Sequence, residues 1–395
     1  MTIIRCGKFA LCLVFICAIF FVEVAQAQQE LEVSSRAVLS DQEWAKVDDS
    51  VARGLSWLAA RQQRDGSFPT LAQGQPGVTS LCTLAFLAHG HLPDEGEYGQ
   101  HLQRAIDYIL SCQQKNGLLA RVAPRGLEIS RRVDHTMGTT AVYNHAIGSL
   151  LLSETYGMVG PDRAAELQPV IETSLEATFL MQGWAKRRKI DNGGWRYLHH
   201  SPSGSRSIDS DLTVTAWQLM FLRSAKNAGF DVPQEPIDNA IQYIKRCYRP
   251  NSGDFNYYAG EGGRPSRGNS GSAILALAHA GYHNSPEALE AGNWILKYPF
   301  DRYNKTETFS LPRGHKDRYH YGVFECSYAM YQLGGKYWED FFPRTARTLI
   351  ANQQPKGSWQ AESYSEDQRY GEAYTTALVL LSLGASNQLL PVFQR

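Results

Sequence analysis

Pairs of hydrophobic segments recur along the chain, one amphipathic and one apolar on all sides, and they predict a repeated helical hairpin. In the clearest pair, one helix ends at residues 179–182 and a second covers residues 208–222, with Asp191-Asn192-Gly193-Gly194-Trp195 in the loop between them. The second helix is apolar almost all round after its first turn, which is typical of a helix buried on both sides. The same three-part unit recurs five more times, more or less degraded.

The spacing of the units predicts how they assemble. Their turn glycines recur about every 50–60 residues, and one interval is about twice as long where the fifth unit lacks the turn. The apolar helices share an entry of Thr or Ser before Ala, at Thr140-Ala141, Thr215-Ala216, Ser272-Ala273 and Thr376-Ala377. Because neither end shows a polar capping repeat, we expect six hairpins that close into an all-α, α/α toroid. Residues 40–395 would form this single domain.

The first 27 residues are typical of a signal peptide. Arg5 and Lys8 precede an apolar run over residues 9–22, and Ala25-Gln26-Ala27 provides a cleavage site. We therefore predict a secreted or periplasmic protein with a flexible lead-in over 28–39 and no stable membrane span after cleavage. Ser40 and Glu43 have the spacing of a capping box that opens the first helix of the fold.

Charge and cysteine content narrow the alternatives. Lys and Arg together number 39, as do Asp and Glu, so the balance gives no reason to expect nucleic-acid binding. Four cysteines follow the predicted cleavage site, and Cys112 and Cys247 occupy the same position in units two apart. Such a separation is too great for a disulfide, and we expect Cys82, Cys112, Cys247 and Cys326 to be buried free thiols.

The unit endings resemble the Gln–Trp repeats of the terpenoid cyclase and protein prenyltransferase superfamily. The resembling stretches are Gln113 to Leu118, Gln182 to Trp195 with an insertion, and Gln353 to Trp359. The resemblance covers nearly the whole chain after the signal peptide, unit by unit. It implies a six-hairpin toroid whose inner helices line a cavity at one end. Independently of any chemistry, the turn glycines Gly66, Gly117, Gly194, Gly253 and Gly357 would permit a positive φ at the helix end.

The resemblance also suggests candidate catalytic residues. Squalene-hopene cyclases carry Asp-x-Asp-Asp-Thr-Ala at the start of an inner helix, where the middle Asp protonates an alkene. The nearest stretch here is Asp209-Ser210-Asp211-Leu212-Thr213, so Asp209 and Asp211 would match the first and middle Asp. Leu212 replaces the last Asp, which removes one group that tunes the acid. The alternative is that Asp209 is a helix N-cap and Asp211 complements the helix dipole.

Other members of the superfamily fit less well. Triterpene cyclases use two helical barrel domains, and this chain supplies one. Prenyltransferase β subunits bind zinc through Asp-x-Cys and a later His, whereas Cys326 lacks that Asp and no His follows His320. His315, Asp317 and His320 share a loop region, which we interpret as solvated. We therefore expect neither a metal nor a cofactor.

Polar and aromatic residues near the inner-helix starts are the candidate ligand-binding residues. They are His135, Tyr143, His145, Trp217, His320, Tyr328, Glu372 and Tyr374. Carboxylates beside aromatic rings on such a fold are also typical of carbohydrate-active enzymes. The first hypothesis is a terpenoid-cyclase-like toroid that binds a hydrophobic ligand, with an isoprenoid as the candidate and cyclase activity in doubt. The alternatives are a non-catalytic scaffold that binds protein or glycan, and a carbohydrate-active enzyme.

Overall fold

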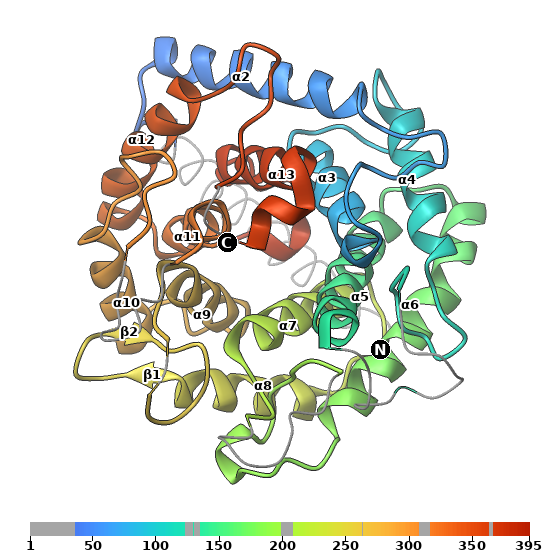
Figure 1. Ribbon diagram of the computed structural model, residues 1–395, viewed down its shortest axis with the longest axis vertical. Helices are drawn as coiled ribbons and strands as arrows, with labels where there is room; N and C mark the ends of the chain where they lie inside the picture. Colours follow the sequence, from blue (N-terminus) through green and yellow to red (C-terminus); the bar gives the residue numbers. More distant parts are fainter. Residues whose placement is uncertain are drawn as a thin grey trace, which may run out of the picture.

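Twelve α-helices of the described residues form two concentric rings (Figure 1). The computed structural model describes residues 36–122, 129, 135–198, 208–262, 264–307, 317–362 and 366–395, and the side chains of 135, 136 and 366 fall outside this description. The outer ring comprises α2 (Asp41–Ala59), α4 (Gly99–Ser111), α6 (Pro161–Gln182), α8 (Gln234–Arg246), α10 (Pro286–Leu296) and α12 (Lys336–Ala351). The inner ring comprises α3 (Gly77–Leu87), α5 (His135–Tyr156), α7 (Leu212–Asn227), α9 (Arg267–His279), α11 (Tyr319–Leu333) and α13 (Gly371–Leu383).

The inner ring is closed. Each inner helix contacts the next, from α3 to α13, and α13 contacts α3. In the outer ring α12 packs against α2, so the last hairpin meets the first. The predicted all-α toroid of six hairpins is confirmed. A short antiparallel hairpin of β1 (Tyr248–Arg249) and β2 (Asp254–Phe255), which the sequence did not indicate, forms the turn between α8 and α9.

Local sequence explains why the helices begin and how they pack. The predicted capping box opens α2, where the Ser40 hydroxyl accepts from the Glu43 amide and the Glu43 carboxylate accepts from the Ser40 amide. Every residue of α3 is buried, whereas α8 buries only one stripe of its surface. This difference in burial follows from position, because an inner helix packs against its outer partner on one side and faces the centre of the ring on the other.

Glutamine side chains tie four of the turns to the next outer helix. The Gln182 amide donates to the backbone carbonyl of Gly193 in its own turn (2.8 Å) and to that of Pro236 in α8 (2.9 Å). Gln353 likewise donates to the carbonyls of Gly357 and of Ser50 in α2, both at 2.8 Å, and so links the two ends of the ring. The positive φ in the third unit belongs to Gly193 (+88°) and not to Gly194, because the turn is one residue earlier than predicted.

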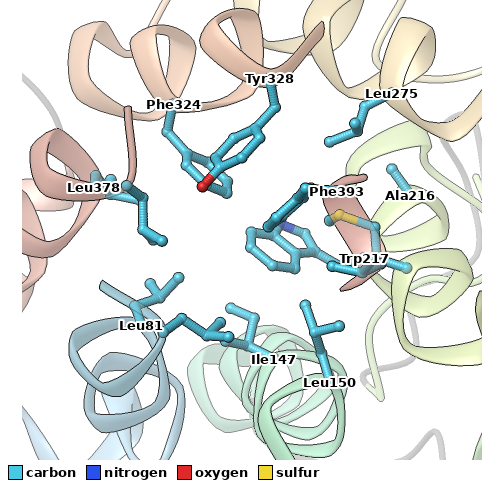
Figure 2. Packing of buried hydrophobic residues seen from close by; sticks show 14 of the residues in the cluster. Leu81, Ile147, Leu150, Ala216, Trp217, Leu275, Phe324, Tyr328, Leu378 and Phe393 are labelled. Carbon is cyan, nitrogen blue, oxygen red and sulfur yellow. The ribbon is translucent and has the colours of Figure 1, made fainter. Parts of the chain in front are cut away.

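The C-terminal segment closes one end of the ring. The short 3₁₀ helix η4 (Pro391–Phe393) packs against α7, and the Phe393 ring stacks on Tyr328 with centroids 3.9 Å apart. Figure 2 shows Phe393 among Trp217, Phe324 and Tyr328 near the centre of the ring. Gln332 and Glu154 fix its backbone, since Gln332 donates to the Phe393 carbonyl and Glu154 accepts from the Val392 amide.

The structure also bears on two further expectations. Cys82, Cys112, Cys247 and Cys326 are buried free thiols, as predicted. Across the described ranges, none of the helices has both the length and the apolar character needed to cross a membrane. The predicted signal peptide lies outside the described residues.

Candidate functional site

A cavity of about 710 Å³ opens at the end of the ring where the inner helices begin. Its lining comes from the first turns of all six inner helices and from the loops that precede them. The volume lies in the range of pockets that hold small molecules. Since the C-terminal segment occupies the opposite end, the ring forms a cup rather than an open channel.

The lining changes character with depth along the inner helices. One group of lining residues is apolar and includes Val78, Leu81, Ile147, Trp217 and Leu378. The Trp217 indole stacks on Phe324 with centroids 5.7 Å apart and an interplanar angle of 10°. The remaining lining is polar and contains six tyrosines and three arginines, namely Tyr143, Tyr197, Tyr257, Tyr321, Tyr370, Tyr374, Arg196, Arg264 and Arg318. The site therefore combines an apolar base with hydroxyl and guanidinium groups.

Asp211 is the N-cap of α7 and lies behind this lining, fully buried. Its Oδ1 accepts from the Val214 amide (2.9 Å) and the Thr213 hydroxyl (3.1 Å). Its Oδ2 accepts from Arg196 Nη1 (3.3 Å) and the Tyr257 hydroxyl (3.2 Å). Burial raises the pKa of Asp211 above its ordinary value, and the Arg196 guanidinium opposes that shift. The hydrogen-bond donors oppose this shift without reversing it, so Asp211 is a weaker acid than an ordinary carboxyl group, which argues against the unusually strong acid that alkene protonation needs.

Asp209 belongs to a different part of the structure. Its carboxylate accepts from the Arg187 backbone amide (2.7 Å) and from the Arg187 guanidinium (2.7 Å) in the loop after α6. It is not the N-cap of α7, because the helix begins at Leu212 and Asp211 takes that position. The alternative interpretation of the two aspartates is therefore corrected: Asp211 caps the helix, and Asp209 fixes a loop.

A hydroxyl network connects the cavity to Asp211. The Tyr197 and Tyr257 hydroxyls form a short hydrogen bond, and Tyr257 donates in turn to Asp211. The Tyr143 hydroxyl lies 2.7 Å from the Thr213 hydroxyl, which also contacts Asp211. Burial raises the pKa of Tyr197 and of Tyr257, so both phenols stay protonated near neutral pH.

Three of the eight predicted ligand-binding residues line the cavity: Tyr143, Trp217 and Tyr374. Tyr328 is buried against Phe393, behind the apolar base. Glu372 forms an ion pair with Lys356 and is not among the lining residues. His135 begins α5, but its side chain falls outside the described residues.

The two other histidines are bound within the protein. His145 is fully buried between the Leu119 amide and the Thr178 hydroxyl, and burial lowers its pKa to about 4. His320 lies between the Glu362 carboxylate (2.8 Å) and the Tyr303 hydroxyl (3.0 Å). Neither ring is part of the lining, so both serve the fold.

Carboxylates are scarce in the cavity. Among the described residues Asp317 is the one carboxylate in the lining, and it binds the buried Arg267 at 2.6 Å. The described lining therefore holds no facing carboxylate pair of the kind that glycosidases use. No group of three potential metal ligands occurs among the described residues.

Sequence reasoning missed the arginines and most of the tyrosines of the site. Arg196 directly follows Trp195 and Arg318 directly precedes α11, so both are placed by turns whose conformation the repeat pattern does not specify. Tyr257 follows β2, which was not expected. The sequence did contain a signal for Arg196, because a positively charged residue lies there between two buried segments.

Comparison with known proteins supports the resemblance inferred above. No profile of a known protein family matches the chain. Over 243 residues the chain is 26% identical to drimenyl diphosphate synthase from Streptomyces showdoensis, a match that covers 60% of this chain and 39% of that enzyme. The chain therefore spans about two fifths of the length of this curated relative.

Solved structures share the fold. A type II terpene cyclase from Scytonema, bound to geranylgeranyl dihydroxybenzoate, matches with a TM-score of 0.52 and 14% identity, covering 89% of this chain and 100% of the cyclase. A family 76 glycoside hydrolase (mannosidase) from Bacteroides thetaiotaomicron matches with a TM-score of 0.56 and 14% identity, covering 87% of this chain and 98% of the hydrolase. The chain is an α/α toroid that resembles the terpenoid cyclases in fold and, over part of its length, in sequence.

Proposed function

We propose that this protein binds a hydrophobic, isoprenoid-like ligand in the central cavity. The observation that carries the proposal is the apolar base of a cavity otherwise built from polar side chains, with the Trp217 indole beside Leu81, Ile147 and Leu378. A hydrocarbon chain placed there would leave water and contact aliphatic and aromatic surface. The relative named as a drimenyl diphosphate synthase and the cyclase bound to a geranylgeranyl compound support this ligand class.

The proposed function is ligand binding and does not include acid-catalysed cyclisation. Protonation of an alkene needs a neutral and unusually acidic carboxyl group. Burial instead raises the pKa of Asp211, which makes it a weaker acid, and Asp209 is occupied by Arg187. A carbohydrate-active enzyme is less well supported, because the described lining offers no facing pair of carboxylates. With its predicted signal peptide, the protein would act outside the cytoplasm.

Mass spectrometry of small molecules that co-purify with the protein from its native host tests the proposal. We expect a polyprenyl or terpenoid compound in the wild type and its loss in Trp217→Ala. The matched control is Trp338→Ala, because Trp338 is also buried and stacked, but on Phe342 of the outer helix α12. The control should retain the ligand. An empty wild-type protein, or equal retention by both variants, would contradict the proposal.

A further inference from the structure

Three arginines line a cavity whose base is apolar. Arg196 comes from the turn before α7, Arg264 from the loop before α9, and Arg318 from the residue before α11. Against them the described lining sets one carboxylate, Asp317, which is already bound to the buried Arg267. The polar part of the cavity is thus rich in guanidinium groups, which a purely hydrocarbon ligand would leave without a partner.

Two of these arginines are held in place by buried carboxylates. Arg196 contacts Asp211 at 3.3 Å, and Arg318 contacts Asp367 at 3.1 Å, with both carboxylates fully buried. The arginine side chains are 22% and 50% exposed, respectively. Each guanidinium has five N–H donors, so one contact to a carboxylate leaves others that can reach the cavity. The aspartates therefore orient the arginines without covering them.

The two guanidinium groups act on the same part of the cavity. Arg196 lies over the Tyr197 ring, 4.7 Å from its centroid, and over the Tyr257 ring at 5.7 Å. Arg196, Tyr197 and Arg318 line the same cavity, and both guanidinium groups lower the pKa of Tyr197 against the larger effect of burial. Among the described residues, four arginines (Arg196, Arg264, Arg267 and Arg318) face three aspartates (Asp211, Asp317 and Asp367) in or behind the lining, which leaves a net positive charge. Tyr143 and Tyr197 line the same cavity, and their hydroxyls form hydrogen bonds with the Thr213 and Tyr257 hydroxyls, respectively.

From this arrangement we propose that the ligand is an anionic amphiphile whose phosphate or carboxylate head group binds between Arg196 and Arg318. The inference rests on the proposed function, because the hydrocarbon part would occupy the apolar base near Trp217. Asp211 then acts as a positioning residue for Arg196. Planar guanidinium groups bind phosphate and carboxylate through paired hydrogen bonds, which suits this head group.

Isothermal titration calorimetry with three probes of one chain length tests the inference. The probes are farnesol, farnesyl phosphate and farnesoic acid, and the proteins are wild type, Arg196→Gln, Arg318→Gln and Arg249→Gln. Arg249 is the matched control, because it is a partly exposed arginine paired with the buried Asp254, outside the cavity lining. Circular dichroism checks that each variant is folded. If one of the two cavity variants fails to fold, the other is compared with the wild type by itself.

We expect the wild type to bind at least one anionic probe ten-fold or more tightly than farnesol, and the preferred probe identifies phosphate or carboxylate. Arg196→Gln and Arg318→Gln should each lose most of this preference while their affinity for farnesol stays within about two-fold. Arg249→Gln should match the wild type. Equal affinity of the wild type for all three probes overturns the head-group inference but leaves the proposed function standing. If no probe binds, the proposed function fails as well.

Discussion

The surroundings of Asp211 determine what this residue can do. Two of its donors, the Val214 amide and the Thr213 hydroxyl, belong to the start of α7, and two others come from Arg196 and Tyr257. The first pair is a helix cap and the second pair belongs to the cavity. Asp211 thereby links the stability of an inner helix to the orientation of a cavity residue.

Substitution of Asp211 should separate these two contributions. Asp211→Ala removes the cap and leaves Arg196 without its carboxylate, and we expect it to lower the free energy of unfolding by about 2–4 kcal/mol. Asp211→Asn keeps the capping oxygen and should cost less, about 1–2 kcal/mol, since asparagine is a good N-cap. Urea unfolding measures both values. Equal losses in the two variants would contradict the assigned capping role.

Glu325 provides a pH-dependent test at the residue scale. It is fully buried on α11 near the Tyr321 and Ser272 hydroxyls, and burial raises its pKa to about 8. The folded protein therefore binds more protons than the unfolded chain between about pH 4.5 and 8, so stability should fall as pH rises through this range. Glu154, whose pKa burial raises to about 7, adds the same trend at lower pH.

Between pH 7 and 8 Glu325 makes the larger contribution, because Glu154, with a pKa of about 7, has titrated in part by pH 7. There the wild type should lose about 1–1.5 kcal/mol of unfolding free energy, and Glu325→Gln, which cannot ionise, should lose much less. Urea unfolding at pH 7 and pH 8 gives the comparison, with Glu154→Gln as the control that keeps most of the wild-type loss. An unchanged decrease in Glu325→Gln would show that this carboxyl is not the titrating group.

The roles of individual residues were predicted least well from the sequence. Sequence reasoning selected Asp211, Tyr143, Trp217 and Tyr374 because the resemblance and the helix starts pointed to them; the last three line the cavity, and Asp211 lies behind the lining. It gave Asp211 as a candidate acid with helix-dipole stabilisation as the alternative, and it missed the contacts of Asp211 to Arg196 and Tyr257, which come from turns outside the repeat pattern. Ion pairs between such turns depend on tertiary structure, which periodicity does not report.

At the scale of elements, the turn between outer and inner helices is the repeated joint of the fold. Its glycine combines a positive φ with close contact to the next outer helix. At Gly117 φ is +79°, and a Cβ there would lie 2.3 Å from the Thr173 backbone oxygen. At Gly96 φ is +65°, but no atom lies within 4 Å of the corresponding position. Substitution of Gly96 therefore tests backbone strain alone, whereas substitution of Gly117 tests backbone strain together with steric conflict.

Alanine substitutions at these glycines test the joint. Gly96→Ala should cost about 1–2 kcal/mol for the left-handed conformation alone. Gly117→Ala should cost roughly 1–3 kcal/mol more, because its methyl group meets a helix backbone that cannot move without disturbing the packing. Thermal unfolding of both variants provides the comparison. Similar losses would indicate that α6 yields easily and that the close approach is unimportant.

Elements were well predicted because their signals are local. Alternation of amphipathic and fully apolar helices follows from burial on one side or on two, and the Gln–Gly–Trp endings gave the turns. The register of the third turn was placed one residue late, since Gly193 and Gly194 are adjacent and sequence alone does not choose between them. The bonds of Gln182 and Gln353 to neighbouring units were not foreseen, because they require knowledge of which helix comes next in space.

For the molecule as a whole, the C-terminal segment determines that the ring has one open end. Phe393 is 1% exposed, and its ring contacts Tyr328 and lies 6.4 Å from Phe324, which supports the Trp217 indole from behind. The base of the cavity is thus built in two layers, and the second layer includes the C-terminal segment. The sequence predicted the ring but gave no sign that its own tail would fill it.

Phe393→Ala tests this arrangement. The substitution should cost about 3–5 kcal/mol of unfolding free energy, as expected for a buried aromatic ring, and should weaken ligand retention by loosening the base under Trp217. Phe341→Ala is the control, because Phe341 is equally well packed, against Phe300, but lies in the outer helix α12. It should lower stability without reducing retention. Equal ligand retention by both variants would show that the C-terminal segment does not support the cavity base.

A crystal structure with a farnesol analogue that carries bromine at its hydrocarbon end tests the central claim most directly. The anomalous signal of bromine locates that end of the ligand without ambiguity. The account predicts a single strong peak inside the toroid, beside Trp217 and Ile147. A peak on the outer surface, or none at a concentration that saturates binding in solution, would contradict the assignment of the central cavity as the isoprenoid site.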